Sequence, residues 1–247
     1  VFAGVSPEML WTPSADADDK NEQVTARWME WFTQRRDATQ PAFSFLYYDP
    51  GYAAAAAAQP VASRSVVEEK LASYRNGIAS VDANVADVLS AIESAESGRD
   101  TVTIIASDHG YEFDDLGLGY IGHASNYGRF QLQSTLLIDW PGREPRQYKH
   151  RSAHQDLPAT LLQELYGCTN PAADFSSGNN LFAGKSWDWF IAGSYNSHAI
   201  VEPDKVVVTY PGGMIDLLDN DYRPSPDLRL DSGLVEEALL EMRRFYR

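Results

Sequence analysis

Three residues near the middle of the chain have the side chains that a divalent metal ion needs. Asp108 and His109 come one residue after the largely apolar run Val102–Ala106, which has the composition of a buried strand. A carboxylate oxygen beside an imidazole nitrogen suits Zn or Mn, and Gly110 lets the backbone turn away at once. His123, in a nearby glycine-rich segment, could be a third ligand or contact a phosphoryl group. We therefore predict a site for Mg, Mn or Zn at Asp108, His109 and His123.

A turn without metal is the alternative interpretation of the same residues. An isolated Asp-His-Gly triplet is more often a strand-to-loop turn, in which the aspartate caps the backbone and the histidine lies on the surface. The second histidine favours the metal site, because two imidazoles then return to the same edge of a sheet. The remaining histidines are predicted to pack or cap rather than to bind metal: His150, His154 and His198.

Basic residues are the second group with possible chemistry. The formal net charge is −15, which argues against general attraction to nucleic acid or to an anionic membrane. Any anionic ligand must therefore be bound by a local basic patch or through a cation. Arg129, which follows His123, could form a bidentate pair with an anionic oxygen. Two further patches are candidates for contact with an anionic headgroup: Arg35 with Arg36, and Arg143 with Arg146, Lys149 and Arg151.

The composition is that of a folded protein. Its 247 residues are enough for one large or two small domains, and 44% of apolar residues can bury a sizeable core. The single cysteine, Cys168, excludes an internal disulfide and is predicted to be a small buried apolar residue. The sequence shows no run of about 18 apolar residues and no signal peptide. Since the first residue is Val1 rather than Met, we expect the chain to be part of a longer protein.

Alternating helices and strands are predicted to position these residues. Apolar periodicity predicts helices over 23–36, 65–97 and 156–166. Asp156 is predicted to cap the last of these helices. Runs rich in β-branched and aromatic residues predict strands over Phe43–Tyr48, Thr101–Ala106 and Leu136–Asp139. The last two strands are predicted to be neighbours in the sheet or nearly so. This order is typical of a layered α/β domain. The alanine run 53–58 is either a helical turn or a replacement that hides other side chains.

The chain after Cys168 changes character. Short alternating runs are separated by Gly, Pro, Asn and Asp, which predicts a small antiparallel meander. A last helix is predicted over Leu234–Phe245, with arginines at its carboxyl end. The aromatic stretch 186–195 is predicted to fill the core of the meander or, alternatively, to form a belt that faces lipid.

Four stretches of the sequence resemble the alkaline phosphatase/sulfatase superfamily. They are ASYRNGIASVDANVADVLSAIES, TVTIIASDHGYEF, IGHASNYGRFQLQSTLLIDWPG and SAHQDLPATLLQELYG. The resemblance implies a three-layer α/β/α, alkaline-phosphatase-like fold with a small C-terminal antiparallel meander and a terminal helix. It also implies two parts: a partial sulfatase-like domain over 1–167 that lacks its early strands, and a C-terminal subdomain over 168–247.

The same resemblance implies roles for single residues. Asp108 and His109 correspond to the superfamily's paired metal ligands, and His123 corresponds to a later histidine near the metal or the substrate's anionic group. The superfamily's first acidic ligand and its Thr, Ser or Cys nucleophile have no counterpart upstream of Asp108. The catalytic residues are therefore unknown, and enzymatic activity is left open.

A narrower resemblance is to the PbgA/YejM family, Gram-negative inner-membrane relatives of lipoteichoic acid synthase. It rests on GHASNYGRFQLQ, on GCTNPAADFSSGNNLF and on the aromatic meander with its arginine-rich last helix. It implies a periplasmic domain tethered to the inner membrane, which binds cardiolipin or lipid A and regulates outer-membrane lipid or lipopolysaccharide homeostasis. The alternative is a metal-dependent phosphatase or a phosphoglycerol or phosphoethanolamine transferase. No nucleic acid partner is expected.

Overall fold

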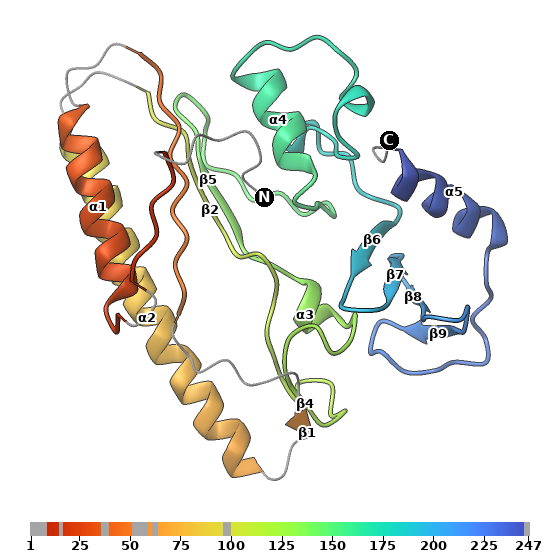
Figure 1. Cartoon of the computed structure of the whole chain (residues 1–247). Coiled ribbons are helices and arrows are strands. Elements are labelled where there is room, and N and C mark those ends of the chain that lie inside the picture. Colours follow the sequence, from red (N-terminus) through yellow and green to blue (C-terminus); the bar gives the residue numbers. More distant parts are fainter. Residues whose placement is uncertain are drawn as a thin grey trace. The chain divides into compact units, whose positions relative to one another are not determined.

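The chain divides into two compact units, seen in a computed structural model that describes residues 9–14, 17–35, 40–50, 59–60, 64–95 and 100–244 (Figure 1). The first unit takes in most of the chain up to Ile104 together with Ile138–Pro141. The second takes in Ile105–Leu137 and the chain from Gly142 onward. The predicted domain division at residue 167 is a different boundary and stays a prediction. No helix in the described ranges combines the length and the apolar character that a bilayer crossing requires.

Two helices form the centre of the first unit. α1 (Lys20–Gln34) and α2 (Arg64–Ser94) lie side by side, which confirms both predicted helices (Figure 1). Buried polar side chains join them, because Thr25 Oγ1 donates to Asn84 Oδ1 over 2.6 Å. Trp28 is buried on the same helix as Thr25, so this face of α1 is the one that packs inward.

The predicted strand over Phe43–Tyr48 is wrong, because this segment joins no ladder. It is tied to α1 by side chains instead: Trp28 Nε1 donates to Ser44 Oγ over 3.1 Å, and Thr25 Oγ1 lies 3.0 Å from the Tyr48 hydroxyl. Residues with high β propensity form a strand only beside another strand that shares their backbone hydrogen bonds. None pairs with this segment in the described part of the chain. The alanine run 53–58 lies outside the described residues.

The two strands that flank the candidate site pair as predicted. β2 (Thr103–Ala106) and β5 (Leu136–Asp139) form a two-stranded sheet. The pairing continues beyond the strands, where the Ser107 N–H donates to the Thr135 carbonyl over 3.1 Å. Burial is lower than the apolar composition predicts, and Leu137 is 59% exposed. β2 ends two residues before Asp108, so the strand delivers the predicted ligands at its carboxyl end.

Short elements that the sequence did not predict follow β2. β3 (Glu112–Phe113) pairs antiparallel with β4 (Tyr120–Gly122), and β1 (Gln59–Pro60) lies on the other side of β4. α3 (Arg129–Leu132) comes after the loop that leaves β4. Such short runs carry no periodicity that a sequence pattern could reveal.

α4 (Asp156–Glu164) confirms the predicted helix, but Asp156 is its first residue and not its cap. The carboxylate of Asp156 is 2% exposed and accepts from the Ala153 N–H, the Asn179 N–H and the Trp187 indole. It therefore fastens the segments before and after α4 to the start of the helix. Two 3₁₀ turns lie in the segment that follows: η2 (Ala172–Asp174) and η3 (Leu181–Ala183).

The predicted meander is confirmed as a four-stranded antiparallel sheet. Its strands, in spatial order, are β6 (Phe190–Gly193), β7 (His198–Val201), β8 (Lys205–Thr209) and β9 (Ile215–Asp219). One face packs against Tyr127, and the other packs against Ala238 of α5 (Ser232–Arg243). α5 begins before the predicted Leu234, because Asp231 accepts from the backbone N–H groups of Gly233 and Leu234.

Candidate functional site

Asp108 and His109 form the first part of the site. Asp108 Oδ1 accepts from the His109 N–H over 3.0 Å, a local turn that fixes the carboxylate beside the imidazole. The His109 ring has a contact at each nitrogen: Nδ1 lies 2.8 Å from the Gly110 carbonyl, and Nε2 lies 3.6 Å from Asp108 Oδ2. The side chain of Asp108 is 67% exposed and that of His109 is 36% exposed. Both groups are therefore accessible to a ligand.

His123 lies beside this pair. The register of β3 and β4 places Glu112 opposite Gly122, so the residue after β4 returns to the residues that precede β3. The rings of His109 and His123 stack with 4.1 Å between centroids and 22° between planes. The ring of Tyr111 lies 6.2 Å from that of His123. The structure thus brings together the three residues that the sequence singled out as metal ligands.

The donor types of this cluster fit a divalent cation, but their arrangement does not. Burial lowers the pKa of His123, the charge of His109 lowers it further, and Asp108 opposes both. A neutral imidazole can ligate a metal. Stacked rings, however, direct their in-plane nitrogen lone pairs along nearly parallel planes rather than toward one point. Among the described residues, no group of three or more His, Cys, Asp and Glu side chains is arranged to hold an ion.

A buried polar network that the sequence did not reveal supports the loop of His123. Glu112 is fully buried, and one of its oxygens accepts from Asn126 Nδ2 over 2.8 Å and from Gln131 Nε2 over 2.7 Å. Gln131 Oε1 in turn accepts from the Ser125 N–H over 3.0 Å. The loop after His123 is therefore bound to β3 and α3. A lone acid between two aromatic residues, Tyr111 and Phe113, was the available signal for this role.

Arg129 lies at the start of α3 and has a carboxylate partner. Its Nη2 lies 3.5 Å from Asp221 Oδ1, with both side chains more than half exposed, so the pair is weak. Its guanidinium also lies over the ring of Phe130, 5.0 Å from the centroid. The predicted contact of Arg129 with an anionic ligand stays a prediction. The other predicted patch is described in part: Arg35 lies over the ring of Trp31, and Arg36 is outside the described residues.

The predicted basic patch after β5 separates into two kinds of residue. Arg151 is a structural residue, because its Nη1 donates to the Trp187 and Asp188 carbonyls and its Nη2 donates to the Val201 carbonyl. Burial lowers the pKa of Arg151, which nearby carboxylates counteract. Arg143 forms an ion pair with Glu164.

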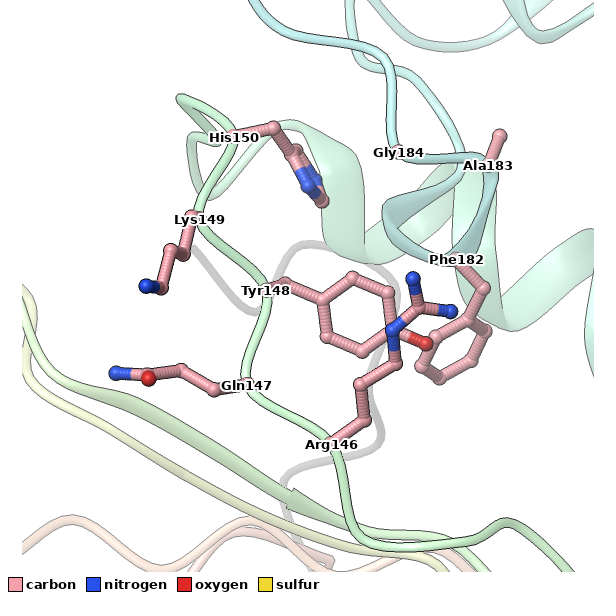
Figure 2. Close-up of a pocket in the computed structure, with 8 residues that line it drawn as sticks. All are labelled: Arg146, Gln147, Tyr148, Lys149, His150, Phe182, Ala183 and Gly184. Carbon is pink, nitrogen blue, oxygen red and sulfur yellow. The ribbon is translucent and has the colours of Figure 1, made fainter.

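Arg146 and Lys149, the remaining two residues of the patch, line a pocket of about 430 Å³. Figure 2 shows that Arg146, Tyr148 and His150 point toward Phe182, whereas Gln147 and Lys149 point to the other side of the same segment. The Arg146 guanidinium lies 5.2 Å from the centroid of Tyr148, and the rings of Tyr148 and Phe182 are 5.9 Å apart. Neither Arg146 nor Lys149 has an ion pair with a described residue. We call this hollow the basic-aromatic pocket.

His154, predicted to pack or cap, bridges the strand ends. Its Nε2 lies 2.9 Å from the Ser107 carbonyl and 3.4 Å from Ser134 Oγ. It thus joins the segment before α4 to the residue that precedes Asp108. This contact fits the predicted structural role.

The chain is similar to parts of longer proteins. It is 27% identical over 173 residues to "Inner membrane protein YejM" of Salmonella typhimurium strain LT2, an alignment that covers 70% of this chain and 29% of that protein. An uncharacterized protein of Haemophilus influenzae is 29% identical over 150 residues, which cover 60% of this chain and 25% of that protein. The chain therefore spans about a quarter of the length of the curated relatives that it matches.

Solved structures share the fold. A protein of the alkaline phosphatase superfamily from Vibrio parahaemolyticus aligns with a TM-score of 0.65 and 16% identity, covering 95% of this chain and 57% of that one. Ps i-CgsB in complex with k-i-k-neocarrahexaose aligns with a TM-score of 0.58 and 16% identity, covering 92% and 54%. At this identity the likeness shows a sulfatase-like α/β fold alone. The sequence pattern of the sulfatase family matches residues 6–167, more than half of the chain. The chain belongs to the sulfatase family.

Proposed function

We propose that this chain is the periplasmic globular part of an inner-membrane protein that binds the phosphorylated headgroup of an acidic lipid. Cardiolipin and the lipid A part of lipopolysaccharide are the two headgroups proposed, and the role is regulation of outer-membrane lipid or lipopolysaccharide homeostasis. The observation that carries the proposal is the basic-aromatic pocket. Similarity to YejM, an inner membrane protein, supports the membrane association.

Electrostatics are consistent with anion binding at this pocket. The net charge of −15 repels an anionic surface, so binding must depend on a place where cationic groups are not neutralised. Arg146 can present a guanidinium to two phosphate oxygens at once, and Lys149 adds a second charge. The rings of Tyr148 and Phe182 offer apolar contact to the glycerol or acyl region next to a phosphate. Each Lys or Arg near an acidic membrane contributes about 1 kcal/mol.

Charge reversal tests the proposal. The double variant Arg146→Glu, Lys149→Glu should lose most of its binding to phosphatidylcholine vesicles that contain cardiolipin or lipid A, measured by co-sedimentation. The matched control is Arg64→Glu, Arg75→Glu, which changes the total charge equally at two exposed positions of α2. Equal loss in both double variants would mean that net charge decides binding and that the pocket does not. Raised salt should weaken wild-type binding.

Within the pocket, the two basic residues should differ. Arg146 points toward Tyr148 and Phe182, and Lys149 points to the other side of the segment (Figure 2). Arg146→Ala should therefore weaken vesicle binding more than Lys149→Ala. A larger effect of Lys149→Ala would place the headgroup on the outer side of the segment.

A metal-dependent phosphatase, or a phosphoglycerol or phosphoethanolamine transferase, is the second candidate. The observation behind it is that Asp108, His109 and His123 meet at the end of β2, and it requires the stacked rings of His109 and His123 to move apart before they could ligate a cation. Hydrolysis of p-nitrophenyl phosphate with added Mn or Zn is the test, with Asp108→Asn as the inactive variant. Activity that needs Asp108 but not Arg146 would favour the enzyme.

We also propose that β2 and β5 belong to the sheet of a three-layer α/β/α fold in the longer protein. The proposed domains of this chain are 1–167 and 168–247.

A further inference from the structure

A second pocket, of about 160 Å³, lies at one end of the meander. Three parts of the second unit surround it: the loop 124–127 after β4, the turn 194–197 between β6 and β7, and two tyrosines, Tyr210 and Tyr222. The turns β6–β7 and β8–β9 lie at the same end of the sheet, because the four strands alternate in direction. We call this hollow the tyrosine pocket.

The lining of the tyrosine pocket is polar but carries no formal charge. It consists of tyrosine, serine, asparagine and alanine residues, without a Lys, Arg, His, Asp or Glu side chain. Hydroxyl and amide groups both donate and accept hydrogen bonds, so they match a ligand whose groups do the same. An anion would find no cationic partner here, and a carboxylate, that of Asp216, lies close to Tyr210. The pocket therefore differs in kind from the basic-aromatic pocket.

Hydrogen bonds fix the shape of the tyrosine pocket. The Tyr127 hydroxyl lies 2.9 Å from Ser197 Oγ, and Ser194 Oγ donates to the Ala124 carbonyl over 2.9 Å. These two bonds join the loop after β4 to the β6–β7 turn. Burial raises the pKa of the Tyr127 phenol and that of the Tyr222 phenol. Both phenols therefore keep their protons and remain hydrogen-bond donors at neutral pH.

The backbone of the pocket is strained. Ala124 has a φ of 60° and Tyr222 has a φ of 59°, a left-handed conformation that costs free energy in a residue other than glycine. In the described ranges, Asp114 is the remaining non-glycine residue with a positive φ. Strained residues concentrate where a fold must hold a particular shape for a ligand. Two such residues in the lining of one small pocket are consistent with a binding role.

An aromatic ring stands open at the rim. Tyr195, in the β6–β7 turn, is 84% exposed, although folding usually buries a large apolar ring. An exposed ring beside hydroxyl and amide groups can pack on the CH face of a polyol while the polar groups bind its hydroxyls. The pocket is also next to the cluster of Asp108, His109 and His123, since the pocket residue Ala124 directly follows His123.

We propose that the tyrosine pocket binds a neutral, hydroxyl-rich group, the chemistry that glycerol and a sugar ring share. Tyr195 forms the stacking surface, and Ser197 with Asn196 and Tyr127 forms the hydrogen-bonding wall. The proposal goes beyond the anionic headgroup site and does not depend on it, because no residue is common to the two pockets.

Saturation-transfer NMR with two probes, glycerol and methyl α-glucopyranoside, tests this proposal on the whole 247-residue chain. Binding of at least one probe should be saturable. Tyr195→Ala should weaken it about tenfold, the scale of one lost aromatic contact. Tyr166→Ala is the matched control, since Tyr166 is 75% exposed and lies outside both pockets. Tighter binding of glycerol or of the glucoside would identify which source the pocket selects.

Two results would overturn the proposal: saturable binding of neither probe, or equal binding in wild type and Tyr195→Ala. Ser197→Ala gives an independent check on the polar wall, and its melting temperature shows whether the turn still folds. Arg146→Glu, Lys149→Glu should bind the neutral probe as wild type does, while Tyr195→Ala should bind cardiolipin vesicles normally. Loss of one property without the other therefore separates failure of this proposal from failure of the proposed lipid function.

Discussion

Two aspartates of the second unit, Asp108 and Asp156, are used in opposite ways. Asp156 is 2% exposed, and backbone and indole N–H groups from both sides of α4 saturate its carboxylate. The side chain of Asp108 is 67% exposed, and its described partners belong to the adjacent His109. A carboxylate whose acceptor sites are filled by the protein holds the fold together. One that keeps open sites can receive a cation or a proton from outside.

The largest effect should come from the saturated aspartate. Asp156→Ala leaves the Ala153 N–H, the Asn179 N–H and the Trp187 indole without their acceptor. A buried donor left without its acceptor costs about 1–3 kcal/mol, and three donors lose theirs here, so the cost is at least about 3 kcal/mol. We expect a loss of that size in the free energy of unfolding, measured by urea titration. Asp108→Ala is the comparison, with an expected change within about 0.5 kcal/mol.

A similar cost in the two alanine variants would contradict this contrast between the aspartates. Asp156→Asn provides a further control, because it keeps the volume and one acceptor oxygen. It should lose less stability than Asp156→Ala. If Asp156→Asn is as unstable as Asp156→Ala, the negative charge of Asp156 matters more than its hydrogen bonds.

The next effect concerns Glu112, a fully buried acid that supports the cluster of Asp108, His109 and His123. Glu112→Ala removes the acceptor of Asn126 and Gln131, which hold the loop after His123. Two hydrogen bonds to a charged group contribute about 3–6 kcal/mol together, and removal of Oε1, which is buried without a hydrogen-bond partner, offsets part of this, so we expect an overall loss of about 2–4 kcal/mol. The His123 imidazole resonances should also shift, because the loop loses its attachment to β3. An unchanged His123 spectrum would show that the stacking of His109 and His123 does not need this network.

Some elements and site residues could be predicted from the sequence and others could not, for physical reasons. Long helices and the meander could be predicted because their apolar periodicity extends over many residues, as in α2 and β7–β8. The Phe43–Tyr48 run has the same β propensity but no strand beside it, and propensity does not show whether a partner exists. Asp108 and His109 were found because a strand end and a motif coincide.

Residues that act through distant contacts were not found. Glu112 and Gln131 are far apart in sequence and meet through β3 and α3, elements too short to predict. The basic patch after β5 looked uniform in sequence, yet tertiary contacts divide it. Arg151 reaches the carbonyls of Trp187 and Val201, whereas Arg146 lines a pocket. A local pattern gives charge and spacing, and it does not give the partners that neutralise a charge.

A smaller effect should appear in the pH dependence of stability. The folded state lowers the pKa of His123 below its ordinary value of 6.5. Between the pKa of His123 in the folded chain and its ordinary value of 6.5, the unfolded chain binds a proton that the folded chain does not. The free energy of unfolding therefore decreases as the pH falls from 6.5 through the folded pKa. His123→Gln should reduce this decrease in urea titrations compared between about pH 7.5 and about pH 5.5. An unaltered pH profile in His123→Gln would assign the dependence to other groups.

The smallest effects, with opposite signs, should come from the neighbours of His123. His109 lowers the pKa of His123, while Asp108 raises it. In metal-free protein, His109→Ala should therefore move the His123 titration to higher pH, and Asp108→Asn should move it to lower pH. Both side chains are at least one third exposed, so solvent screening keeps the shifts small, and NMR titration of the imidazole protons is the suitable measurement. Shifts in the same direction would mean that the three side chains are not held together in solution. The cluster of Asp108, His109 and His123 would then differ from the hydrogen bonds around Asp156 in rigidity as well as in exposure.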